Sequence, residues 1–322
     1  MAEHSKIEWT DHTFNPWEGC QKVGPGCDYC YAESRNARYA DGQAVNWGPG
    51  APRRRTSAAN WRKPLAWNKA HAEFFALHGR RQRVFCSSLA DVFDNAVDRA
   101  WHRDLFDLIE LTPNLDWLLL TKRIGNVVRM LPTHDWAARD NVWLGATICN
   151  QDEADRDIPK LLAVPAAKRF LSMEPMLGPV DLARIDLNGH AEIYPLKGTT
   201  GCETDDGDPL PDIPPLDWII VGGESGPGAR PMHPDWARDL RDQCTAAGVP
   251  FLFKQWGEWC PAESVPDDDE RKLDEQWLRH DGSLRAKGDW VDFFCGDEVL
   301  YRAGKKVAGR LLDGREWNEV PQ

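Results

Sequence analysis

The 322-residue sequence contains no apolar run long enough to span a bilayer, and residues 1–10 show neither an apolar signal region nor a cleavage site. From these absences we expect a cytoplasmic protein that is not inserted in a membrane. Internal repeats and low-complexity tracts are also lacking. With 42% hydrophobic residues, the chain can still bury a substantial core in one large domain.

Positive charge is scarce: 39 Lys and Arg stand against 51 Asp and Glu, for a formal net charge of −12. This balance argues against a protein that wraps duplex DNA over its whole surface. Residues 31–83 are the exception, with eleven basic and three acidic residues and interleaved Tyr and Trp. Such a segment can hold phosphates while stacking bases, with Arg53, Arg54 and Arg55 on the phosphates. The alternative is a solvated basic face whose aromatic residues belong to the core.

Three cysteines, Cys20, Cys27 and Cys30, fall within eleven residues in the run NPWEGCQKVGPGCDYCYAE. Three thiolates suit zinc or an iron–sulfur cluster and suit calcium or magnesium poorly. A structural zinc site commonly pairs two C-x2-C knuckles, and the sequence has no second one, although His12 could supply a fourth ligand. A cluster on three cysteines leaves one iron open for a substrate or cofactor. We favour the cluster over zinc, and both over ordinary free cysteines.

The other six cysteines give an odd total of nine. In a reducing compartment they stay as thiols, and we interpret them as small buried residues, with the one in a polar loop, Cys202, as the exception. The six are Cys86, Cys149, Cys202, Cys244, Cys260 and Cys295.

Seven short apolar runs recur along the chain, and several are separated by helical patterns such as residues 96–111 and 234–248. Continuous apolar strands alternating with helices predict an α/β fold: a (β/α) barrel, complete or partly open, with six to seven parallel strands, or a doubly wound open sheet as the alternative. We place the barrel at residues 1–258, with a cluster loop at 20–30 and an insertion at 182–216, and a packed C-terminal extension at 259–322. The runs are residues 6–10, 83–89, 116–122, 141–148, 168–174, 217–225 and 249–256.

Polar residues follow most of these runs. In parallel barrels the chemistry lies at the carboxyl ends of the strands, so we expect these side chains to line one pocket. Helix capping accounts for Ser87 or Asp91. It does not account for Lys122, Glu174 and Lys254, which are candidate catalytic residues because long charged groups beside apolar strands need partners or a ligand. The strand-exit residues are Ser87, Ser88, Asp91, Thr121, Lys122, Arg123, Asn150, Gln151, Ser172, Glu174, Glu224, Ser225, Lys254 and Gln255.

The cysteine triad, with Tyr29 directly before Cys30, resembles the cluster loop of radical SAM enzymes, although six residues separate Cys20 and Cys27 where that family normally has three. The segments IEWTDHTFNPWEGC, LSMEPMLGPVDL, WIIVGGESGPGARPM and GKKVAGRLLDGREWNEVP resemble a family of phage proteins of unknown function over nearly the whole chain.

The radical SAM resemblance implies a [4Fe–4S] cluster on the triad, bound S-adenosylmethionine, and a reductant protein that supplies electrons. The run VGGESGPGARP matches neither the dinucleotide fingerprint nor the P-loop. It resembles the Gly-Gly-Glu element that holds the amino group of the cofactor in these enzymes, and Glu174 competes with Glu224 for that role. The residues assigned to cofactor binding are Tyr29, Ser172, Gly222, Gly223 and Glu224.

Together these observations predict a radical SAM-like enzyme acting on a nucleic acid or nucleotide, as a DNA repair lyase or a base-modifying enzyme. The alternative is a zinc-stabilised, non-catalytic module that binds nucleic acid or a partner. A metal-dependent hydrolase using Asp91, Glu174 and Glu224 is disfavoured, because no motif such as H-E-x-x-H is present.

Overall fold

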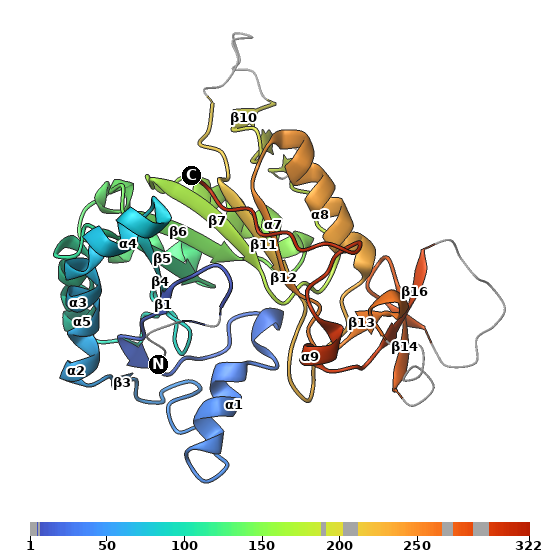
Figure 1. Cartoon of the computed structure of the whole chain (residues 1–322), viewed down its shortest axis with the longest axis horizontal. Helices are drawn as coiled ribbons and strands as arrows, with labels where there is room; N and C mark the ends of the chain where they lie inside the picture. The colour runs from blue at the N-terminus through green and yellow to red at the C-terminus, as the bar shows by residue number, and fades with distance from the viewer. Residues whose placement is uncertain (1–4, 6, 188–190, 202–211, 266–272, 286–295) are drawn as a thin grey trace. The chain divides into compact units, whose positions relative to one another are not determined.

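The main sheet of the computed structural model has seven strands in the order β1-β4-β5-β6-β7-β11-β12 (Figure 1). The structure describes residue 5 and residues 7–187, 191–201, 212–265, 273–285 and 296–322. The strands are β1 (His12–Thr13), β4 (Gln82–Cys86), β5 (Leu115–Thr121), β6 (Val142–Thr147), β7 (Lys168–Met173), β11 (Trp218–Gly222) and β12 (Phe251–Gln255).

The predicted α/β fold class with parallel strands is confirmed. Strand β4 pairs in parallel with β1 and β5, β5 with β6, and β11 with β12. The order is linear with β1 and β12 as edge strands, which is the partly open form. Six of the seven predicted runs coincide with strands. The run at residues 6–10 does not, because Thr10 closes a turn onto the carbonyl of Ile7 and the strand begins only at His12.

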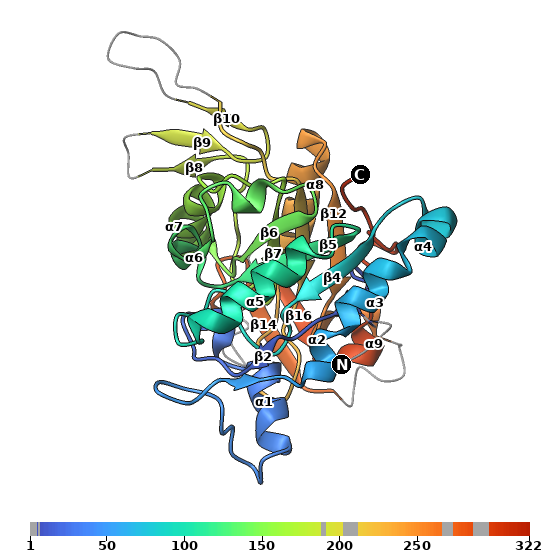
Figure 2. The same ribbon diagram turned by 90° about the vertical axis from the view of Figure 1, so that its left-hand side faces the viewer.

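Two compact units divide the chain: residues 1–146 with 163–170, and residues 147–162 with 171–322. The first unit contains four of the sheet strands and a series of short helices (Figure 2). Its remaining elements are β2 (Trp17–Glu18), η1 (Pro25–Cys27), α1 (Tyr31–Arg38), β3 (Arg54–Arg55), α2 (Ala58–Trp61), α3 (Lys63–Lys69), α4 (His71–His78), α5 (Arg99–Glu110), η2 (Ile124–Asn126), α6 (Val127–Met130) and η3 (Trp136–Ala138).

Helix capping and close packing in the first unit account for particular residues of its sequence. Helix α5 begins after Asp98, whose side chain accepts a hydrogen bond from the backbone N–H of Ala100, and it buries Leu105 and Leu108 as its apolar spacing predicts. Close packing also requires Gly145 on β6, because a Cβ there would lie 2.3 Å from the ring of Phe170.

The second unit contains α7 (Gln151–Leu162) and α8 (Pro234–Ala247) beside its strands. Helix α8 starts at Pro234, as predicted, and ends at Ala247; it is capped by Gly248, whose φ of +71° suits glycine. The predicted insertion holds a small antiparallel sheet in the order β10-β9-β8, made of β8 (Ile185–Asp186), β9 (Glu192–Tyr194) and β10 (Thr199–Thr200).

The C-terminal part of the second unit forms a four-stranded sheet in the order β13-β16-β14-β15, followed by a tail that returns to β12. Backbone N–H groups of Phe253 and Glu319 donate to the carbonyls of Trp317 and Phe251, so the tail covers the edge of β12. The domain boundary at residue 258 stays a prediction. The elements are β13 (Cys260–Pro261), η4 (Ala262–Ser264), β14 (Glu275–Arg279), β15 (Leu284–Arg285), β16 (Asp297–Tyr301) and α9 (Lys305–Ala308).

Four cysteines outside the triad, Cys86, Cys149, Cys244 and Cys260, are buried free thiols, as predicted. Cys202 and Cys295 lie outside the described residues. None of the helices in the described part of the chain combines the length and apolar character needed to cross a bilayer.

Candidate functional site

The cysteine loop lies in the first unit between β2 and α1. Cys20 lies two residues after the end of β2, Cys27 is the last residue of η1, and Cys30 is the N-cap of α1. The loop starts at Gly19, whose φ is +108° and where a Cβ would lie 2.5 Å from the carbonyl oxygen of Asn46, so only glycine fits. All three cysteines are free thiols.

The donor chemistry of the triad fits a thiolate-bound metal group, but the loop does not gather the three sulfurs at one point. Cys27 lies close enough to Cys30 for an electrostatic interaction. Burial raises the pKa of Cys20 to about 11 and also raises that of Cys30. Among the residues that the structure describes, no three His, Cys, Asp or Glu side chains are placed to share a metal ion.

His12, considered above as a fourth zinc ligand, has a different place in the structure. Its ring is only 5% exposed and stacks on Trp67, with the two ring centroids 4.0 Å apart. No metal-binding group among the described residues includes it. The prediction is corrected because His12 belongs to the strand β1 and packs in the core.

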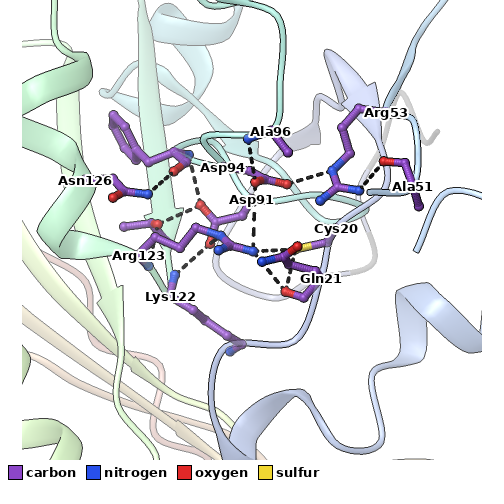
Figure 3. A network of polar contacts seen from close by, with 12 residues as sticks. Cys20, Gln21, Ala51, Arg53, Asp91, Asp94, Ala96, Lys122, Arg123 and Asn126 are labelled. Carbon is purple, nitrogen blue, oxygen red and sulfur yellow. Dashed lines mark hydrogen bonds and ion pairs between the residues drawn. The ribbon is translucent and has the colours of Figure 1, made fainter. Parts of the chain in front are cut away.

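The exit of β5 brings two cations to the cysteine loop (Figure 3). Arg123 places Nη2 3.7 Å from Sγ of Cys20 and donates a hydrogen bond of 2.9 Å to the carbonyl of Gln21. The positive charge of Lys122 lies near enough to Cys30 to oppose the rise in the pKa of that thiol. One predicted strand-exit residue, Arg123, therefore contacts the predicted cluster loop, and a second, Lys122, acts on it through its charge.

Two carboxylates support this exit. Asp91 accepts hydrogen bonds from the hydroxyl of Thr121 at 2.6 Å and from the backbone N–H groups of Phe93 and Lys122 at 2.9 Å. Asp91 thus joins the segment after β4 to the end of β5, and both of its carboxylate oxygens accept hydrogen bonds from these donors. Sequence reasoning missed Asp94, which follows Asp91 by three residues in ADVFDN; that spacing was the available signal.

The structure separates the roles of the three consecutive arginines. Arg53 is a correction: its side chain is 1% exposed and its Nε donates to Asp94 at 2.7 Å, so it cannot meet a phosphate. Arg54 is exposed and pairs with Glu18. Arg55 pairs with Asp104 at 2.5 Å and lies over the ring of Trp61.

Helix α1, directly after the cysteine loop, exposes aromatic and basic side chains that sequence reasoning noted only as part of the basic segment. Tyr31 and Tyr39 are 57% and 77% exposed, and the guanidinium of Arg35 lies 5.3 Å from the ring centroid of Tyr39. Within the described residues, no carboxylate lies within ion-pair distance of Arg35 or Arg38. The one acid of the helix, Glu33, pairs with Lys22.

The second unit brings together four predicted site residues at the ends of β7, β11 and β12. Nζ of Lys254 lies 2.5 Å from Oε2 of Glu174, and both side chains are less than 20% exposed. Oγ of Ser172 lies 3.5 Å from Oε1 of the same carboxylate. A Cβ on Gly222 would lie 3.2 Å from Oε2 of Glu174, so glycine leaves room for this pair.

The remaining two residues of the Gly-Gly-Glu element have structural contacts in the second unit. Glu224 accepts three hydrogen bonds from Arg230, one from the backbone N–H and two from the guanidinium, at 2.7–2.9 Å. A Cβ on Gly223 would lie 1.8 Å from the carbonyl oxygen of Trp256. Glu224 is therefore held by Arg230 within its own loop. Of the two candidate carboxylates for the cofactor, Glu174 is the one paired with a lysine. These contacts also count against a hydrolase that uses Asp91, Glu174 and Glu224 as a metal-binding set.

Comparison with curated proteins gives no match. Solved structures of spore photoproduct lyase resemble the chain distantly. A cysteine mutant with a dinucleoside spore photoproduct is 12% identical, with a TM-score of 0.39, and the alignment covers 94% of this chain and 71% of the lyase. The lyase complexed with the dinucleoside gives 12% identity, a TM-score of 0.39, and 93% and 70% coverage. At these values the likeness says nothing of what this chain does.

Nearly the full length of the sequence matches one family model, described as protein of unknown function DUF5131, which covers residues 4–321. The chain therefore belongs to this family.

Proposed function

We propose that the protein is an iron–sulfur enzyme of the radical SAM type that acts on a nucleic acid or nucleotide, as a repair lyase or a base-modifying enzyme. The observation that carries this proposal is the loop with three free thiols beside Lys122 and Arg123 at the carboxyl end of β5. Cys20, Cys27 and Cys30 would hold a [4Fe–4S] cluster. Such a cluster, reduced by a partner protein, supplies the electron that cleaves S-adenosylmethionine.

The chain's own residues suit this assignment electrostatically. A cluster with thiolate ligands is an anion, and two cations at the β5 exit offset part of its charge. Tyr29, 47% exposed on the loop itself, stays assigned to cofactor binding. Lys122 stays our candidate catalytic residue in this unit.

In the second unit we propose Glu174 rather than Glu224 as the carboxylate that takes the amino group of S-adenosylmethionine. Glu224 is fully engaged by Arg230, whereas Glu174 shares its charge with the half-buried Lys254. Ser172 and Gly222 adjoin Glu174 and stay assigned to cofactor binding. Lys254 stays a candidate catalytic residue, because its ammonium lies beside the Glu174 carboxylate at the carboxyl end of β12.

Helix α1 is the surface that supports our proposal of a nucleic-acid substrate. Exposed tyrosines provide stacking surfaces for bases, and Arg35 and Arg38 are cations without a carboxylate partner among the described residues. Arg54 is a further exposed cation in the same unit. This surface replaces the predicted set of Arg53, Arg54 and Arg55, of which only Arg54 is mostly exposed.

The experiment that tests the proposal is metal analysis of anaerobically purified protein with single Cys→Ala changes. We expect about four irons per chain in the unaltered protein. Cys20→Ala, Cys27→Ala and Cys30→Ala should lose most of this iron. The control Cys244→Ala, at a buried thiol of α8, should keep it.

Zinc in place of iron would contradict the proposal and support the zinc-stabilised binding module. Iron that survives all three changes in the loop would show that the metal binds elsewhere.

A further inference from the structure

Helix α4, which follows α3 in the first unit, is an apolar helix without a buried side (Figure 2). Five of the eight residues in its sequence, HAEFFALH, are apolar, yet none of the eight is buried. Every other α-helix in the described part of the chain buries at least one residue. Leu77 is 78% exposed, and Phe75 is exposed as well. Apolar surface gathered on one helix in this way marks an interaction face.

The aromatic rings of α4 contact residues of the helix itself and of the turn after it. The ring centroid of Phe74 lies 4.2 Å from that of His78, and the guanidinium of Arg80 lies 5.1 Å from the Phe74 centroid. The ring centroids of His71 and Phe75 are 5.6 Å apart. These contacts all fall within residues 71–80, so they order the rings without covering the exposed side of the helix.

Four exposed residues follow one another at intervals of four along α3 and α4: Leu65, Lys69, Glu73 and Leu77. The two helices meet at Ala70, which is the C-cap of α3 and the N-cap of α4. Among the described residues, neither Lys69 nor Glu73 has an oppositely charged side chain within ion-pair distance. The segment therefore has an exposed leucine at each end and two opposite charges without a partner between them.

The order of these four residues is self-complementary. When the segment is set against a second copy that runs in the opposite direction, Leu65 meets the partner's Leu77, and Lys69 meets the partner's Glu73. A two-fold axis makes each of these contacts twice, which is the form that an interface between identical subunits takes. A segment with charges of one sign would repel its own copy, whereas this order attracts it.

We propose that α3 and α4 form the interface of a homodimer, in which this segment packs in the antiparallel direction against the same segment of a second copy. The leucines supply the apolar contact, and the two equivalent ion pairs fix the register. The inference does not depend on the proposed function, because it uses none of the residues assigned to the cluster, the cofactor or the nucleic acid.

The first test is the molar mass of the full chain in solution, measured by light scattering after size-exclusion chromatography over a range of protein concentrations. We expect twice the chain mass of 36.5 kDa at the higher concentrations. Leu77→Asp should shift the protein to the mass of one chain. The matched control Leu111→Asp, at a leucine after α5 that is 66% exposed in the same unit, should stay dimeric.

Charge reversal tests the register of the two segments. Lys69→Glu and Glu73→Lys each place like charges opposite one another, and each should raise the dimer Kd about tenfold or more. The double variant Lys69→Glu/Glu73→Lys should restore the original Kd. An equimolar mixture of the two single variants should form a heterodimer, because both contacts then join opposite charges.

The mass of one chain at every concentration would overturn the inference. A dimer whose Kd is the same in Leu77→Asp and in both single charge reversals would also overturn it. If the single chain instead bound anionic lipid vesicles or polyglutamate, and lost this binding in Leu77→Asp, the face would belong to a membrane surface or an acidic protein rather than to a second copy.

Discussion

Arg53 and Arg54 are neighbours in the sequence, yet they carry very different ion pairs. The pair of Arg53 with Asp94 is 1% and 0% exposed at its two side chains, whereas the side chain of Arg54 is 64% exposed in its pair with Glu18. A buried charge that loses its partner cannot be rescued by water, while an exposed charge is readily solvated. The same residue type therefore supports the fold at one position and is available to solvent at the next.

Replacing Arg53 by Ala should greatly lower the free energy of unfolding, because the buried charge of Asp94 would keep only the backbone N–H of Ala96 and the guanidinium of Arg123, 4.0 Å away, among its described partners. We expect a loss of about 3–5 kcal/mol. Arg54→Ala should cost no more than about 1 kcal/mol, as expected for an exposed pair. Urea unfolding curves followed by tryptophan fluorescence measure both. Similar losses for the two variants would disprove the structural role of Arg53.

Sequence patterns were informative about residues whose chemistry is local. The spacing of the three cysteines predicts a metal site, which stays a prediction. Lys254 and Glu174 were each predicted to need a partner, and the structure pairs them with each other. The pair of Arg53 with Asp94 could not be found, because the two lie 41 residues apart and only the fold shows that both are buried. Likewise, the motif at residues 221–231 suggested a cofactor loop, because the sequence does not show that Arg230 hydrogen-bonds the carboxylate of Glu224.

At the scale of elements, α1 differs from the other helices of its unit in what it presents to solvent. The helix has one buried residue, Ala32, and its outer face carries Tyr31, Arg35 and Arg38, with Tyr39 directly after the helix. The Tyr31 hydroxyl donates to the carbonyl of Ser88, but packing does not explain the exposed ring of Tyr39 beside Arg35 and Arg38, which have no carboxylate partner among the described residues. Contact with a strand of nucleic acid does, because phosphates attract the arginines and bases stack on the rings.

The double variant Arg35→Gln/Arg38→Gln should therefore bind a single-stranded oligonucleotide more weakly and with less dependence on salt. Two lost phosphate contacts lower the slope of log K against log salt by about 1.4. Tyr39→Ala should cost about 1–3 kcal/mol of binding through lost stacking. Fluorescence anisotropy across a salt series measures both effects.

The matched control for this experiment is Arg129→Gln/Arg139→Gln, which removes two positive charges from the first unit outside α1. If the control weakens binding and flattens the salt dependence equally, the effect comes from net charge, and α1 is not the binding surface.

Elements with long apolar runs were the predictable part of the fold. Six strands of the main sheet follow such runs, and α8 has a proline at its start and a glycine after its end. The first strand was predicted at residues 6–10 instead of His12–Thr13, because a strand of two residues has no hydrophobic periodicity in the sequence. The small sheet of β13 to β16 was not predicted, because its pairing is antiparallel and joins segments about 40 residues apart, Cys260 with Tyr301 among them.

For the whole molecule, the distribution of charge agrees with a substrate bound at a limited surface. The chain carries −12 overall while residues 31–83 carry an excess of basic residues. Many of those basic residues are used internally: Arg80 forms a bidentate contact with Asp11, and Arg81 pairs with Asp116 and Asp140. Among the described residues, Arg35 and Arg38 on α1 are basic residues of this segment without a carboxylate partner, as are Arg62, Lys63 and Lys69 on α2 and α3.

We propose that the cysteine loop holds a cluster that engages S-adenosylmethionine. The most direct measurement is the EPR spectrum of the anaerobically purified, reduced protein, recorded with and without S-adenosylmethionine. We predict the signal of a reduced [4Fe–4S] cluster that changes when the cofactor is added, because the open iron gains a ligand. A cluster signal that the cofactor leaves unchanged, or bound zinc with no signal at all, would contradict the account.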